Sequence, residues 1–170
     1  MQEYYTHFSF ILELTPKERR WLKTSYEELG ELIELISTSE DTGIIEGRQT
    51  ELIEKNFHKD SCYLWVPEMR LEDGAVHLYA DPSQTQEGEI ASTASWLSVF
   101  LRENNPERTI LFTWSQGAGS AVPDVFGGGA CLVTAEGWYT INTWDEDVLK
   151  NLQQQRTERA ERQMQEGEKS

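Results

Sequence analysis

Residues 115–130 form the stretch of the sequence whose side chains could best hold a small ligand. They combine several glycines with four polar side chains, those of Ser115, Gln116, Ser120 and Asp124. The stretch follows an expected strand, as phosphate-binding loops do, but it lacks the lysine of a P-loop and the helix that should come next. Ser120 also lacks the G-x-S-x-G frame of a hydrolase nucleophile. A long hairpin connection is the simpler interpretation, and a small hydrolase or small-molecule-binding domain that uses this loop is the alternative function.

The chain has three histidines and two cysteines, and their spacing does not indicate a metal site. His58 and Cys62 lie four residues apart, and His7 and His77 could meet across neighbouring strands. A zinc site needs three or four converging ligands, which nothing in this spacing supplies. Cys62 and Cys131 each lie in an apolar, strand-like run, so we expect buried thiols in a reduced cytosol rather than a disulfide. We therefore expect no catalytic residue, no metal and no cofactor.

The charges of residues 16–36, an expected helix, run in the unfavourable direction. The first half carries four basic residues, and the second half carries four acidic ones, which are Glu27, Glu28, Glu31 and Glu34. The helix dipole instead favours acids at the start and bases at the end, by roughly 0.3–1 kcal/mol at an exposed site. Either other parts of the fold compensate for this order, or the acidic end meets a positively charged partner.

The acidic end of this helix has a spacing that could imitate nucleic acid. Glu27, Glu31 and Glu34 share one helix face, where neighbours four residues apart lie about 6 Å from each other. Phosphates repeat along one DNA strand at a comparable spacing. Glu40 and Asp41 follow in the polar segment after the helix and extend the acidic surface.

The composition favours a basic partner over nucleic acid itself. Thirty acidic and fifteen basic residues give a formal net charge of −15, whereas binding to phosphates needs clustered lysine and arginine. We expect a non-enzymatic protein that binds a basic partner protein through the acidic surface. An example is an inhibitor, carried by a mobile element, of a host protein that handles nucleic acid or serves in defence. A solvated acidic face that only keeps the protein soluble is the simpler alternative.

The length and hydropathy of the chain indicate one domain with a real core. The 170 residues are 38% hydrophobic and include six tryptophans, which argues against global disorder. No apolar run approaches the length of a membrane span, and the first residues lack the pattern of a signal peptide. We expect a cytoplasmic protein that does not insert into a membrane.

The expected elements alternate in a pattern typical of an α+β domain. Thr15, Pro16 and Glu18 form a capping box with proline at the first helical position, which predicts where the first helix begins. Strands are expected at 8–14, 62–71, 75–80, 109–114, 129–135 and 138–141, helices at 16–36, 90–104 and after 146, and either a helix or a strand within 44–57.

The order β-α-β-β-α-β matches a split βαβ, ferredoxin-like sandwich, followed by an added β-hairpin and a C-terminal helix. We expect a single α+β domain over residues 1–155 and a polar helical extension or tail over residues 156–170. Two packing expectations accompany this fold. Gly30 should mark a close approach between the first helix and a neighbour, and four tryptophans should be largely buried, namely Trp21, Trp65, Trp96 and Trp114.

Three segments resemble a family of uncharacterised bacterial and phage proteins of similar size. They are Phe112–Ser115, which ends a strand with tryptophan, Asp124–Ala130, which contains F-G-G-G-A, and Val133–Ala135, which reads V-T-A. The opening Phe8–Phe10 strand is also similar. The resemblance covers about half of the chain and implies no catalytic residue, because the function of the family is unknown. In charge, though not in motif, the chain also resembles small acidic anti-restriction and anti-CRISPR inhibitors of mobile elements.

Overall fold

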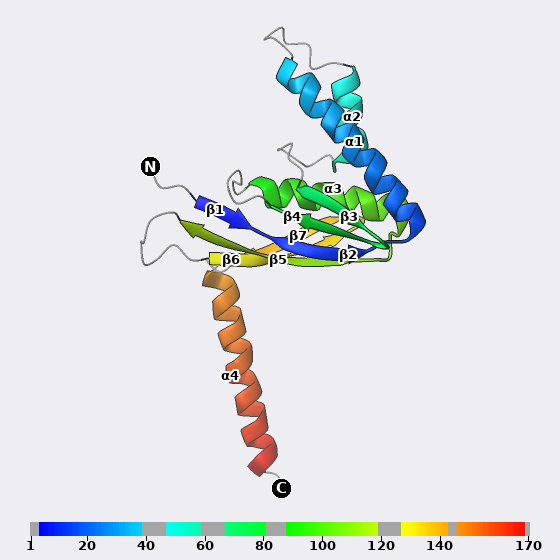
Figure 1. Ribbon diagram of the computed structural model, residues 1–170. Helices are drawn as coiled ribbons and strands as arrows, with labels where there is room; N and C mark the ends of the chain where they lie inside the picture. Colours follow the sequence, from blue (N-terminus) through cyan, green and yellow to red (C-terminus); the bar gives the residue numbers. More distant parts are fainter. Residues whose placement is uncertain are drawn as a thin grey trace.

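The computed structural model of the protein describes residues 4–38, 47–58, 67–80, 88–118, 127–142 and 146–168. Within these ranges the chain forms seven strands and four helices (Figure 1). In chain order they are β1 (Tyr4–His7), β2 (Ser9–Glu13), α1 (Pro16–Thr38), α2 (Arg48–Asn56), β3 (Glu68–Glu72), β4 (Ala75–Tyr79), α3 (Gly88–Asn104), β5 (Ile110–Ala118), β6 (Gly127–Thr134), β7 (Gly137–Asn142) and α4 (Glu146–Glu168).

Both sheets are antiparallel, and the N-terminal segment takes part in both of them. One sheet has the order β1-β5-β6-β7 and the other has the order β2-β4-β3. Phe8 separates β1 from β2, and its carbonyl accepts a hydrogen bond of 3.0 Å from the amide of Ala80. The α+β class is therefore confirmed. β4 lies between β2 and β3, as a split βαβ unit requires, but the strands form two sheets, so the ferredoxin-like topology is not confirmed.

α3 is the most deeply buried element, and it packs under α1 on the covered side of the sheets (Figure 1). Every residue from Ser92 to Leu101 is buried, including the small polar residues Ser92, Thr93, Ser95 and Ser98, so burial of this helix is not limited to one apolar stripe. Of the four tryptophans, Trp96 is fully buried in α3. Trp21 and Trp114 are only partly buried, and Trp65 lies outside the described residues.

The start of α1 has the capping box that the sequence predicts. The amide of Glu18 donates to Thr15 Oγ1 at 3.2 Å, and the amide of Thr15 donates to Glu18 Oε1 at 3.4 Å. Glu18 is only 4% exposed, and its other oxygen, Oε2, accepts a hydrogen bond of 2.8 Å from Arg108. The carboxylate therefore caps α1 and also ties it to the segment before β5.

Gly30 does not mark a close approach, so that expectation was wrong. A Cβ atom built on Gly30 would have no neighbour within 4 Å, and the residue is exposed. The reason is that the second half of α1 leaves the sheets and runs along α2, and this side of the helix faces solvent (Figure 1).

Several element boundaries differ from those the sequence predicts. The strand expected at 8–14 is β2, whereas β1, which precedes it and joins the other sheet, was not expected. The undecided segment 44–57 contains the helix α2. β5 continues to Ala118, four residues past the expected end. The helix expected after 146 is α4, which continues as a helix beyond residue 155 with exposed side chains from Gln153 to Glu168, and the division of the chain at residue 155 stays a prediction.

Candidate functional site

The second half of α1 and the whole of α2 form a protruding acidic hairpin, defined as residues 27–38 and 48–56 (Figure 1). It carries six carboxylates and two cations, an excess of four negative charges. The carboxylates are Glu27, Glu28, Glu31, Glu34, Glu51 and Glu54, and the cations are Arg48 and Lys55. α2 thus brings two further acids, Glu51 and Glu54, beside the predicted row.

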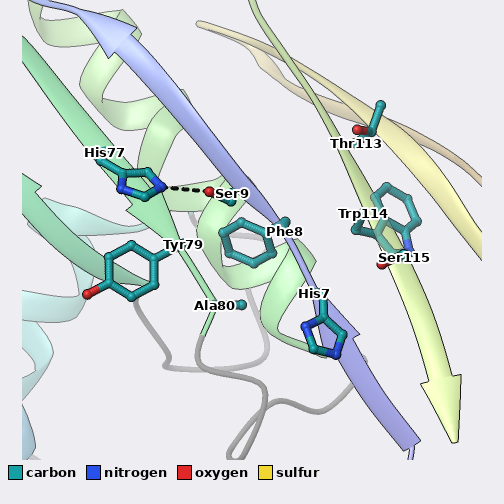
Figure 2. Close-up of a pocket in the computed structure, with 9 residues that line it drawn as sticks. All are labelled: His7, Phe8, Ser9, His77, Tyr79, Ala80, Thr113, Trp114 and Ser115. Carbon is teal, nitrogen blue, oxygen red and sulfur yellow. Dashed lines mark hydrogen bonds between the residues drawn. The ribbon is translucent and has the colours of Figure 1, made fainter.

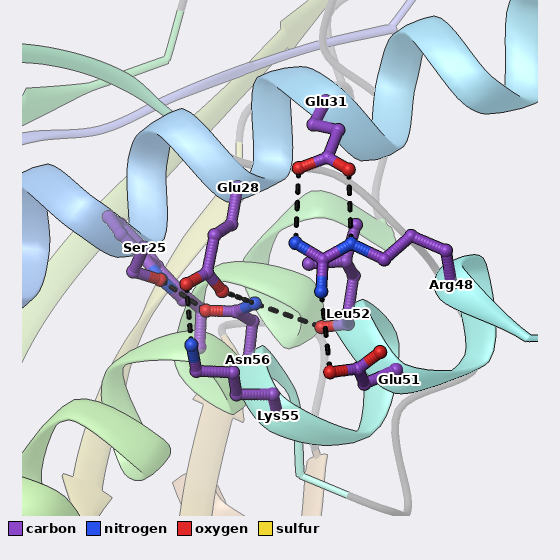
Figure 3. Close-up of polar contacts among 9 residues, drawn as sticks. Ser25, Glu28, Glu31, Arg48, Glu51, Leu52, Lys55 and Asn56 are labelled. Carbon is purple, nitrogen blue, oxygen red and sulfur yellow. Dashed lines mark hydrogen bonds and ion pairs between the residues drawn. The ribbon is translucent and has the colours of Figure 1, made fainter.

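Arg48 lies between the two helices and pairs with carboxylates of both (Figure 3). Its Nε is 3.0 Å from Glu31 Oε1 and its Nη2 is 3.3 Å from Glu31 Oε2, while Nη1 is 3.3 Å from Glu51 Oε1. Hydrogen bonding to Arg48 lowers the pKa of Glu31 below its ordinary value. A lowered carboxyl pKa means that this pair stabilises the hairpin above the ordinary carboxyl pKa and weakens as the pH falls through the lowered value.

Glu28 belongs to the packing between the helices rather than to the outer surface. Lys55 Nζ lies 2.5 Å from Glu28 Oε1, and Asn56 Nδ2 donates to Glu28 Oε2 at 3.0 Å. The Glu28 side chain is only 13% exposed. The unfavourable charge order of α1 is therefore partly compensated within the chain, because Arg48 and Lys55 supply cations beside its acidic end.

A buried polar network joins α1, α2 and α3 beneath these ion pairs. Ser25 Oγ donates to Asn56 Oδ1 at 2.5 Å and accepts a hydrogen bond of 2.8 Å from Trp96 Nε1. Asn56 Nδ2 also donates to the carbonyl of Leu52 at 2.9 Å. The network therefore links α2 to both α1 and α3 beneath the ion pairs.

Replacing Ser25 by alanine is expected to reduce the free energy of unfolding by about 2 kcal/mol. The change leaves the buried Trp96 Nε1 and Asn56 Oδ1 without this shared partner, and a buried unsatisfied polar group costs about 1–3 kcal/mol. Urea denaturation followed by tryptophan fluorescence measures the loss. The exposed neighbour Thr24 provides the control, since Thr24→Ala should stay within about 0.5 kcal/mol of the parent; equal effects of the two variants would contradict the network's role.

The predicted partner-binding residues are thus divided between different environments. Glu27 and Glu34 are exposed on α1, while Glu31 is paired with Arg48 and Glu28 lies against α2. Glu40 and Asp41 lie outside the described residues. The sequence did not predict that α2 adds acidic residues to this surface. The spacing of Leu52, Ile53 and Asn56 is nevertheless that of a helix face that packs against a neighbour.

A recess of about 550 Å³ lies where the two sheets meet (Figure 2). Strands β1, β2, β4 and β5 and the residues beside them supply its lining, which contains no acidic residue, lysine or arginine: His7, Phe8, Ser9, His77, Tyr79, Ala80, Thr113, Trp114 and Ser115. The strands alternate, so His7 and Ser9 project from the same side of the N-terminal segment. His7 and His77, which the sequence suggested could meet across strands, both line this recess.

Ser9 and His77 form a hydrogen-bonded pair at the edge of the recess. Ser9 Oγ and His77 Nε2 are 2.6 Å apart, and the His77 ring lies 4.9 Å from that of Tyr79 (Figure 2). A nucleophile–base pair has this geometry, but catalysis also needs a group that orients the base and donors for the developing charge. No carboxylate contacts His77 in the part of the chain that the structure describes, and the non-enzymatic function stays a prediction.

The alternative ligand loop is largely strand where the structure describes it. Ser115 lies in β5 and lines the recess, and the backbone of Gln116 pairs with Gly127 of β6. The side chain of Gln116, together with Ser120 and Asp124, lies outside the described residues. β5 supplies three of the nine lining residues, and the other six come from β1, β2, β4 and the residues beside them, which no sequence pattern connected with this loop.

Cys131 in β6 is the one cysteine within the described ranges, and its side chain lies in the hydrophobic core. It is fully buried, and this burial raises the pKa of its thiol to about 12. Such a thiol stays protonated and poorly nucleophilic, as expected for a small buried apolar residue. Cys62 lies outside the described residues. Over the described ranges, no group of three or more His, Cys, Asp or Glu residues is arranged to hold a metal ion.

Among the described helices, none combines the length and the apolar composition needed to cross a bilayer. No protein-family model, no curated protein and no solved structure matches the chain. A function must therefore be inferred from the fold, the acidic hairpin and the recess between the sheets.

Proposed function

We propose that the protein is a non-enzymatic binding protein whose acidic hairpin docks onto a basic partner protein. The observation that carries this proposal is the distribution of charge on the hairpin. Both of its cations, Arg48 and Lys55, are held against Glu31 and Glu28, so the surface that faces away from these contacts is dominated by carboxylates. Such a surface attracts a basic partner and steers its approach, and salt weakens both effects.

The partner class that fits best is a protein with a basic groove for nucleic acid. The exposed carboxylates of the hairpin, such as Glu27 and Glu54, can occupy such a groove in place of phosphates. Glu31, which would complete a row with a spacing of about 6 Å on α1, is paired with Arg48. Inhibition by occupation of the groove predicts that duplex DNA and this protein compete for the same partner.

The test reverses two hairpin acids that have no role in the ion pairs. A variant with Glu27→Lys and Glu54→Lys changes the net charge from −15 to −11, because each substitution adds two positive charges. Both side chains are exposed, so the fold should be retained. Capture of a basic protein from a lysate at low salt should weaken about tenfold or more, and high salt should release the partner from the parent protein.

The control variant carries the same charge change elsewhere. Glu107 and Glu136 are exposed and lie outside the hairpin, so Glu107→Lys with Glu136→Lys also gives a net charge of −11. The proposal requires that this control still binds the partner and that DNA displaces it. Equal binding by both variants, or a captured partner that is acidic or neutral, would leave the hairpin with a solubilising role alone.

A further inference from the structure

The recess between the two sheets is lined by residues outside the acidic hairpin, and strand pairing fixes its shape from both sides (Figure 2). His7 lies opposite Ser115 in the pairing of β1 with β5, and Ser9 lies opposite Tyr79 in the pairing of β2 with β4. Residues directly opposite each other in an antiparallel pair share one face of the sheet. These four side chains are therefore held around the recess before any ligand arrives, and such preorganisation lowers the cost of binding.

The base of the recess belongs to the hydrophobic core. Phe8 and Ala80 line it although they are only 4% and 5% exposed, and the amide of Ala80 donates to the Phe8 carbonyl at 3.0 Å. Within the core, the ring of Phe112 lies 5.5 Å from that of Phe8 and stacks on that of Phe10 at 4.7 Å. The base is thus apolar and well packed, and it suits the apolar part of a ligand.

The walls of the recess combine aromatic rings with polar groups that act through single atoms. The residues with rings that are at least partly exposed are His7, His77, Tyr79 and Trp114, and those with aliphatic hydroxyl groups are Ser9, Thr113 and Ser115. None of the nine lining residues is an aspartate, glutamate, asparagine, glutamine or arginine, whose paired atoms would hold the edge of a nucleobase or a carboxylate by two hydrogen bonds. The lining instead matches a flat ring with separate hydroxyl substituents, because a hydroxyl both donates and accepts.

The charges around the recess favour an uncharged ligand. Neither a lysine nor an arginine is among the lining residues, so an anion finds no counter-ion there, and the lack of carboxylates leaves a cation without one as well. A charged group without a partner is costly to remove from water. Strand register places Arg70 opposite His77 and Glu68 opposite Tyr79, so one charge of each sign flanks the recess and neither sign of ligand gains a local advantage.

We propose that the recess binds an uncharged aromatic compound that carries isolated hydroxyl groups, such as a naphthol. The ring of the ligand packs against Tyr79 and Trp114, and such ring contacts add to the free energy gained by burial. The hydroxyl group meets Ser9, whose Oγ lies 2.6 Å from His77 Nε2 and keeps hydrogen-bonding capacity beyond this contact. A volume of about 550 Å³ is within the usual range for small-ligand sites. Ligand binding here is a separate property, and it does not rest on the proposed function of the hairpin.

Titration calorimetry of the full chain with three probes tests the chemical class of the ligand. 2-Naphthol should bind with a dissociation constant below about 1 mM and saturate at one molecule per chain. 2-Naphthoate has the same rings but carries a charge, and adenosine has a planar base that needs paired hydrogen bonds. Each of these two compounds should bind about tenfold more weakly or worse. No binding of 2-naphthol, or tighter binding of either comparison compound, would overturn the proposal.

Two pairs of variants test where the probe binds. Ser9→Ala removes the hydroxyl group and should weaken 2-naphthol binding about three- to tenfold, whereas Ser37→Ala, at an exposed position of α1, should bind like the parent. Thr113→Trp obstructs the recess and should abolish binding. Leu111→Trp places the same side chain on the same strand, at a residue that is 68% exposed and outside the recess, and should leave binding unchanged.

Unchanged binding by Thr113→Trp would overturn the assignment of the recess as the site. Unchanged binding by Ser9→Ala would overturn the role of its hydroxyl group in holding the ligand. Thermal melting of each variant checks that its fold is retained, so that a loss of affinity reports on the recess itself.

Discussion

Replacing Gly129 by alanine is expected to lower the free energy of unfolding by about 3 kcal/mol. A Cβ atom at this position would lie 2.5 Å from Trp114 Cζ2 and 2.6 Å from Trp114 Cη2, and it would also meet the carbonyl oxygen of Ile141. The indole of Trp114 lies across β6 where Gly129 has no side chain, so the methyl group has no space. Overpacking of this kind typically costs about 1–3 kcal/mol, and contact with backbone on one side places Gly129→Ala at the upper end.

Differential scanning calorimetry should show this loss as a melting temperature lower by about 6–12 °C. Gly30→Ala is the control, because a Cβ atom there meets nothing within 4 Å. Alanine is the better helix former by about 1 kcal/mol, so Gly30→Ala should raise the melting temperature. A Gly129→Ala protein that melts within about 2 °C of the parent would show that β6 and Trp114 can shift to admit a side chain.

Arg108→Ala is also expected to lower the free energy of unfolding by about 3 kcal/mol. Arg108 Nη1 donates to Glu18 Oε2 at 2.8 Å and to the carbonyl of Glu13 at 2.9 Å. Without Arg108, the nearly buried Glu18 carboxylate loses its cation, and removal of one partner of a buried ion pair costs about 3–5 kcal/mol. The lower end applies because the Arg108 side chain is 26% exposed. Denaturant titration measures the change.

A double-mutant cycle separates the charge of Glu18 from its capping role. Glutamine can fill the same position of a capping box, so Glu18→Gln removes the charge and keeps the acceptor for the Thr15 amide. The variant that combines Glu18→Gln with Arg108→Ala should be more stable than Arg108→Ala alone. Simple additivity of the two changes would mean that the pair does not interact.

Local signals in the sequence predicted the elements whose limits depend on nearby residues. Thr15 and Glu18 marked the start of α1, where the amide of Glu18 donates to Thr15 Oγ1 as the capping box predicts. The α+β class follows from the same local patterns, because apolar spacing distinguishes helices from strands. Of the predicted acids on α1, Glu27 and Glu34 are exposed, which the helical spacing also indicates.

The features that the sequence did not reveal depend on contacts between distant residues. Arg48 and Lys55 pair with Glu31 and Glu28 because α2 packs against α1, where Ser25 also hydrogen-bonds to Asn56. The residues just before Phe8 include Thr6 and His7 and show no regular apolar alternation, so nothing local predicts a strand there that joins the other sheet. Ser9 and His77 are brought together by the pairing of β2 with β4, and no spacing rule links them.

The division of the N-terminal segment at Phe8 also has a consequence for how the chain acquires its structure during synthesis. The β2-β4-β3 sheet contains only residues up to Tyr79, so it can assemble while the second half of the chain is still being made. β1 must wait, because Tyr4 pairs with Ala118 and Thr6 pairs with Gln116. Pairings so distant in sequence slow folding, and unpaired strand edges are exposed to other chains until they close. β1 is therefore among the last strands to pair, and its backbone hydrogen-bonding groups stay unpaired on the nascent chain until β5 has been made.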